Sequence, residues 1–392
     1  MKEFPVDLAA IAARDAYALT NHVKVDDAIA YLNSKYGDAF TFSQENMLKG
    51  KSGGPFFIKS RTAFGFTLVG KGAFYGHAFI IFRGTEYLAD ILTDLNISVS
   101  SSSTGKPVHD GFNKSFKSME LQLISFMSSA EMKNVHSIHC IGHSLGGALA
   151  TVCGDWIQTT YKRKPYIYSF GCPRVGLYGF ASRCTTGVGS ERIFRAYHKT
   201  DIVPCIPPWP FIHTPNTGTD YYLWSPGMIP MGEYHKMKNY VKSVEDKTWQ
   251  SITRVNNLEK DENSIMNWLK DSSYVGLTMS SIEWLNQALI FVLKKCMDGV
   301  AWLISETFST SFTLLDQLAY ILNKGINLAN TVSDWVMYLV KKILQVLGMS
   351  DAIVTADLSV QFIRMALQNL HQRVNGYAKD ALSKALVDGR AI

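Results

Sequence analysis

A serine at position 144 lies in the pentapeptide G-H-S-L-G (142–146), after an apolar, β-like run and before residues 145–161, which have helical composition. Between a strand and a helix, such a serine occupies a strained turn that lifts its hydroxyl clear of the backbone. Glycines flank it because side chains there would clash with the strand or the helix. The N-terminus of the helix also favours negative charge developing beside the serine. The pattern predicts Ser144 as a nucleophile.

A nucleophilic serine needs a base, and the base needs a carboxylate that orients it. Asp201 follows the β-like run 193–197 within a few residues, in the kind of loop where this carboxylate belongs, so we assign it as the acid. Of the histidines that come later in the chain, two are candidates for this base. His213 lies in a loop-rich segment that can fold back over the site, and His235 precedes a short helical segment. Residue order alone leaves both open as the base.

Negative charge on an acyl oxygen would need backbone N–H donors close to the serine. The N–H of Leu145, directly after the nucleophile, is the first expected donor. The second should come from a loop after an earlier strand. Residues 82–85 (F-R-G-T) end the β-like run 77–82, and their glycine lets the backbone turn inward, so we assign Thr85 as the second donor.

The surrounding elements alternate in a way that can hold these groups together. Residues 7–33 predict two leading helices, and the runs 63–69 and 77–82 flank a Gly-Lys-Gly turn that is typical of a hairpin. Further β-like runs at 135–141, 166–170 and 193–197 alternate with helical segments. This alternation predicts an α/β fold with a mostly parallel sheet, in which chemistry gathers at the carboxyl ends of the strands.

Composition narrows the class of protein. The 392 residues are 47% hydrophobic and 18% charged, which excludes disorder as the main state. The net charge is +6, but no long run of Lys or Arg occurs, so we expect no nucleic-acid partner. The cysteines are scattered without C-x-x-C pairs, and no His/Cys/Asp/Glu group has metal-ligand spacing, so we expect no metal and no other cofactor. We read no secretory signal in the first residues, and we expect synthesis in the cytoplasm.

The last part of the chain has a different character. Residues 246–274 are polar and are interpreted as a connector between a catalytic domain at 1–245 and a helical domain at 275–392. Between Leu315 and Val346, apolar residues recur every seven positions, a pattern typical of helices packed side by side. We therefore expect an all-helical hairpin or bundle. Its role is either internal packing or the binding of lipid or a protein partner.

Five ordered motifs resemble those of class 3 lipases over about residues 60–240: F-R-G-T (82–85), V-H-D-G-F (108–112), G-H-S-L-G-G-A-L-A (142–150), F-G-C-P-R-V-G (170–176) and D-I-V-P (201–204). The resemblance implies an α/β-hydrolase fold and hydrolysis of acylglycerols or phospholipids without a metal. It supports Ser144, Asp201, Thr85 and Leu145 in the roles given above. It favours His213 as the base, because the family's histidine precedes a Tyr/Trp-containing segment. His235 resembles a different family element.

Three expectations follow from the resemblance. Residues 87–95 occupy the position of the lid helix of such lipases, and they form either a moving lid or a fixed core helix. The substrate is expected to be membrane phospholipid, with neutral acylglycerol as the alternative, because the mild positive charge favours an anionic surface. Some antibacterial lipase effectors also combine such a core with an extra domain. Export by a signal-less secretion system is therefore a hypothesis, with an immunity or delivery protein as the partner of the helical domain. A toxin-like module with a silent hydrolase body is the competing one.

Overall fold

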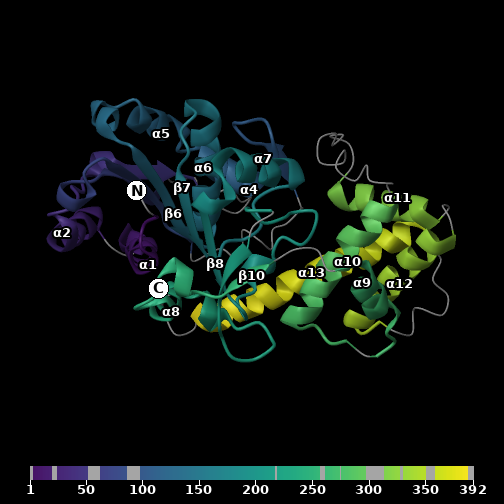
Figure 1. Ribbon diagram of the computed structural model, residues 1–392. Coiled ribbons are helices and arrows are strands. Elements are labelled where there is room, and N and C mark those ends of the chain that lie inside the picture. Colours follow the sequence, from purple (N-terminus) through teal and green to yellow (C-terminus); the bar gives the residue numbers. More distant parts are fainter. Residues whose placement is uncertain are drawn as a thin grey trace.

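The computed structural model combines a mixed-sheet body with a group of helices at one side (Figure 1). It describes residues 3–19, 24–51, 62–85, 98–216, 219–256, 261–273, 275–296, 313–326, 330–349 and 358–386. Residues 87–95, expected to form either a moving lid or a fixed core helix, lie outside these ranges.

The body is built on one eight-stranded sheet with the strand order β1-β2-β3-β6-β7-β8-β9-β10. Strands β3, β6, β7, β8 and β9 run parallel, whereas β1, β2 and β10 are antiparallel additions at the two edges. The bounds of the strands are β1 (Met47–Gly50), β2 (Thr62–Val69), β3 (His77–Phe82), β6 (Ser137–His143), β7 (Tyr166–Phe170), β8 (Ile193–His198), β9 (Thr219–Leu223) and β10 (Arg254–Asn256). The mostly parallel sheet and the β2–β3 hairpin confirm the expected α/β fold. A separate two-stranded sheet pairs β4 (Val99–Ser101) with β5 (Pro107–His109).

Helices cover both faces of the sheet, which is why its central strands read as continuous apolar runs. Strand β3 shows the arrangement: Ala78, Ile80 and Phe82 join the core on one face, and Phe79 and Ile81 join the core on the other. The first face is covered by α4 (Asp110–Lys117) and α6 (Leu145–Tyr161), and the second by α1 (Val6–Asp15) and α8 (Met237–Val244). Further helices in the described part of the body are α2 (Val25–Tyr36), α5 (Glu120–Met127) and α7 (Tyr178–Val188).

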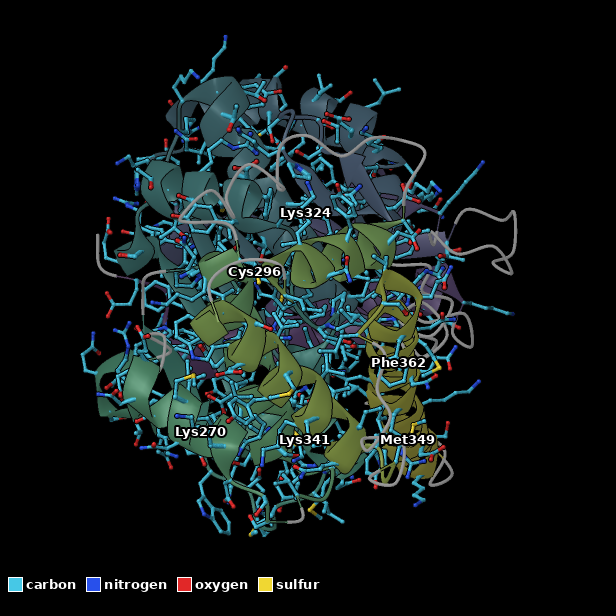
Figure 2. The ribbon with its side chains drawn as sticks, turned by 90° about the vertical axis from the view of Figure 1, so that its right-hand side faces the viewer. Lys270, Cys296, Lys324, Lys341, Met349 and Phe362 are labelled. Atoms are coloured by element: carbon cyan, nitrogen blue, oxygen red, sulfur yellow. The ribbon has the colours of Figure 1, made fainter. Side chains whose placement is uncertain are left out.

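The C-terminal part is helical, as expected. It contains α9 (Glu262–Lys270), α10 (Met279–Cys296), α11 (Leu314–Ile326), α12 (Asn330–Val346) and α13 (Val360–Leu386). The seven-residue pattern covers two helices, α11 and α12, and its members Leu318, Leu322, Val336 and Leu339 are buried. Figure 2 views this side of the molecule, with α10–α13 in front of the sheet. Among the described residues, no helix is both long enough and apolar enough to cross a bilayer.

The expected connector at 246–274 is wrong. Trp249 is buried in the core beneath β8 and β9, β10 extends the sheet, and α9 packs on α10 and α12. The stretch is thus divided between the two parts, because apolar residues near its start pack in the body and those of α9 pack in the helical part, which composition alone does not reveal. The helices also touch the body directly. The N–H of Trp209 donates to Asn286 of α10 (2.8 Å), and α13 packs on the short 3₁₀ turn η7 (Gly232–His235).

Candidate active site

Ser144 lies at the turn between β6 and α6 and has a backbone conformation with positive φ (φ 58°, ψ −128°). Such a conformation costs a non-glycine residue about 1–3 kcal/mol and persists only where the surroundings enforce it. The close packing of Gly146 helps to hold this conformation, because a Cβ at that position would lie only 2.3 Å from the carbonyl oxygen of Phe82. The same tight approach brings the end of β3 against the turn. The strand–turn–helix geometry expected for Ser144 is therefore present.

His235 joins Ser144 to Asp201 in one hydrogen-bonded row. Its Nε2 lies 2.9 Å from Ser144 Oγ, and its Nδ1 lies 2.8 Å from Asp201 Oδ2. Because a carboxylate only accepts, Nδ1 carries the proton and the lone pair of Nε2 faces the serine hydroxyl. Asp201 also accepts hydrogen bonds from the hydroxyl of Tyr240 (2.6 Å) and the N–H of Val203 (3.0 Å). This row can take a proton from the serine and hold the resulting imidazolium beside a carboxylate.

His213, expected to be the base, lies elsewhere, and that expectation is wrong. Its Nε2 is 3.1 Å from Nη2 of Arg195, which is itself ion-paired with buried Asp220. The guanidinium can only donate, so Nε2 accepts and has no lone pair left for a serine. Burial, reinforced by Arg195 and Arg174, holds the pKa of His213 well below its usual value.

The topology explains why His213 and His235 have different positions. His213 precedes β9 and therefore lies towards the amino end of that strand, beside Arg195 in β8. His235 follows β9, so it lies at the carboxyl edge, where β6 ends at Ser144 and β8 leads to Asp201. The β-like run 219–223 is the signal that could have separated the two histidines. In the resemblance to class 3 lipases, this run falls within the Tyr/Trp-containing segment that favours His213.

Two further histidines hold the turn that carries His235, a role that the sequence does not indicate. His143 Nε2 lies 2.7 Å from the carbonyl oxygen of His235, and His198 Nδ1 lies 2.8 Å from that of Tyr234. Since a carbonyl only accepts, each of these nitrogens carries a proton. His143 Nδ1 must then accept from the hydroxyl of Tyr17, 2.7 Å away. Burial is the main cause of the lowered pKa of both, to about 4 for His198 and well below the usual range for His143.

The loop after β3 lies against the serine, as the expected oxyanion donors require. A Cβ on Gly84 would lie 3.1 Å from Ser144 Cβ, and half-buried Thr85 is the next residue. Leu145 is buried at the first position of α6. Leu145 directly follows Ser144, and Thr85 directly follows Gly84, which lies against Ser144. Their role as oxyanion donors stays a prediction. In the part of the chain that the structure describes, no group of three or more His, Cys, Asp and Glu side chains could hold a metal ion.

The parallel sheet, the strand–serine–helix turn and the Ser144–His235–Asp201 row define the α/β-hydrolase class of fold. Residues 79–211 match the family model described as Lipase (class 3).

Two curated relatives each match somewhat more than a third of this chain. Secreted mono- and diacylglycerol lipase 1 of Fusarium solani is 32% identical over 148 residues, which is 36% of this chain and 42% of the relative. Phospholipase A1-II 6 of Oryza sativa is 30% identical over 169 residues, 38% of this chain and 40% of the relative. The chain thus spans less than half the length of these two relatives. Among solved structures, nonglycosylated Lip2 lipase of Yarrowia lipolytica aligns at a TM-score of 0.46 and 18% identity, covering 65% of this chain and 85% of that one.

Proposed function

We propose that the protein hydrolyses carboxylic esters of lipids through an acyl-enzyme on Ser144. The observation that carries this proposal is the unbroken row from Ser144 through His235 to Asp201. Ser144 Oγ attacks the acyl carbon while His235 Nε2 takes its proton, and N–H groups near Leu145 stabilise the oxyanion. His235 then protonates the departing alcohol. Water, activated by the same histidine, hydrolyses the acyl-enzyme.

For the substrate we propose membrane phospholipid, cleaved in the manner of a phospholipase A. The relative from rice is named a phospholipase, and the net charge of +6 is compatible with an anionic membrane. A neutral acylglycerol is the second candidate, supported by the name of the Fusarium relative. The toxin-like alternative with a silent hydrolase body is disfavoured, because the row of three side chains is complete.

The test combines one substitution with product analysis. Mixed bilayers containing phospholipids and diacylglycerol are incubated with the wild-type protein and with Ser144→Ala, and the products are identified by mass spectrometry. We expect fatty acid and lysophospholipid from the wild type, and a loss of about 10⁶-fold in the variant, the scale of triad knockouts. Free fatty acid from diacylglycerol alone would favour the second candidate. A pure Ser144→Ala protein retaining more than a few per cent of turnover would refute the nucleophile.

Delivery and partners are separate hypotheses that stay predictions. Export of the chain by a signal-less secretion system to a rival or host cell predicts toxicity only when active protein reaches the target membrane. An immunity or delivery protein bound by residues 275–392 predicts co-purification with the full chain that survives Ser144→Ala. Toxicity that also survives Ser144→Ala would place the activity outside the hydrolase site.

A further inference from the structure

An exposed apolar loop lies on the same edge of the sheet as the proposed nucleophile. Trp224, Met228 and Ile229 are 70%, 67% and 59% exposed, and they fall within six consecutive positions. The loop leaves the carboxyl end of β9 and leads to η7, which carries His235. Since β9 is parallel to β8, its end shares an edge with the segment that carries Asp201. Exposed large apolar side chains that cluster in this way mark an interaction surface.

Hydrogen bonds hold the two ends of this loop beside Asp201. Buried Ser225 accepts a hydrogen bond from the N–H of Thr200 (2.9 Å), and the N–H of Met231 donates to the carbonyl of Thr200 (2.9 Å). Thr200 directly precedes Asp201. The carbonyl of Met228 accepts from the N–H of Met279, at the start of α10 (3.1 Å). The exposed side chains are therefore presented by a tethered backbone, in a fixed relation to the catalytic row.

The tryptophans that the structure describes in the helical part, Trp268, Trp284 and Trp335, present less apolar surface. Trp268 and Trp284 stack on each other with ring centroids 5.6 Å apart, and Lys342 Nζ lies 5.1 Å from the Trp268 ring. Trp335 is half-buried, with Lys295 Nζ 5.1 Å from its ring. These rings are partly used for packing and for contacts with cations. The expectation that the helical domain supplies the lipid contact is therefore less well supported than a contact through the loop after β9.

We propose that the surface formed by Trp224, Met228 and Ile229 docks the protein on the apolar–polar boundary of a lipid bilayer. This inference rests on the proposed function, because that function places the lipid ester at the same edge of the sheet. Trp, with an apolar ring and one N–H, suits this boundary, and Met and Ile reach into the acyl region. Residues 223–232 contain no charged side chain, so the contact is apolar rather than electrostatic. These residues are distinct in the sequence from the segment 87–95, whose sequence position resembles that of a lipase lid.

The experiment measures binding without hydrolysis. Full-length Ser144→Ala protein is sedimented with vesicles of pure phosphatidylcholine, alone and with the added changes Trp224→Ser, Met228→Ser and Ile229→Ser. We expect the three changes to reduce the partition coefficient by at least about tenfold, because each removes apolar surface that enters the bilayer. Binding should change little between 0.05 and 0.5 M NaCl (about 14 Å to about 4 Å of screening length). Thermal unfolding checks that the variant is folded.

Tyr75 provides a matched control. Its ring is 66% exposed, but it precedes β3 and so lies at the amino edge of the parallel strands, away from Ser144. Tyr75→Ser should leave vesicle binding unchanged. Equal binding by the triple variant and its parent, or no binding by the parent, overturns the proposal, and so does binding that salt abolishes. Because all proteins carry Ser144→Ala, these results are independent of whether the wild type hydrolyses any lipid.

Discussion

Replacement of the two candidate histidines is the most direct test of the site. His235→Ala removes both hydrogen bonds that join Ser144 to Asp201, so the serine loses its proton acceptor. Triad members act as one unit, and loss of the base in such a unit costs about 10⁶-fold in kcat, or roughly 8 kcal/mol of transition-state stabilisation. Asp201 would keep its bonds from Tyr240 and Val203, so the fold should survive.

His213→Ala is the matched change, with the opposite expectation. It removes the acceptor of one Arg195 hydrogen bond, while the ion pair of Arg195 with Asp220 remains. The expected cost is about 1–3 kcal/mol of folding free energy, as for a buried donor left unsatisfied. The kcat per folded molecule should stay within about an order of magnitude of wild type.

The assay is hydrolysis of a soluble short-chain ester, scaled to the folded fraction from thermal or denaturant unfolding. Combining Ser144→Ala with His235→Ala should cost no more than either change alone, because the residues act together. An inactive but folded His213→Ala protein beside an active His235→Ala protein would refute the geometry on which the assignment rests.

Three further predictions concern a buried hydrogen bond, a buried histidine and the helical part. Tyr17→Phe leaves buried Nδ1 of His143 without its donor, so kcat on the soluble ester should fall several-fold with KM little changed, and thermal unfolding should occur earlier. Burial lowers the pKa of His109 from 6.5 to about 4. Between pH 6.5 and pH 4 the unfolded chain therefore binds a proton on this histidine that the folded chain does not bind. The free energy of unfolding thus falls as the pH drops through this range. His109→Phe should reduce the stability loss between pH 7 and pH 4 by roughly 3 kcal/mol in urea unfolding, and an unchanged loss would contradict this account. A chain ending at Asn256 should lose stability and soluble-ester hydrolysis together, because α13 no longer packs on the turn that carries His235; full activity in a stable truncated protein would contradict it.

Local patterns in the sequence determined much of the catalytic framework. The G-H-S-L-G turn, the helix 145–161 and the strand 166–170 depend on neighbours within a few residues, and the structure has both elements with these bounds. Asp201 could be assigned because it closely follows a recognisable strand. The helical character of the C-terminal part could likewise be read from its apolar repeat, since that repeat is a property of the helix itself.

The choice between His213 and His235 was decided only by the tertiary structure. Both histidines follow Asp201 in the chain, and the family resemblance favoured the wrong one. The direction of β9 places His213 before the strand, beside Arg195, and His235 after it, at the carboxyl edge. The contact of α13 with η7 was equally hidden, because an apolar helix face shows that a helix packs but not on what. A catalytic row joins residues far apart in the chain, so the order of the strands, which no local pattern encodes, selects its members.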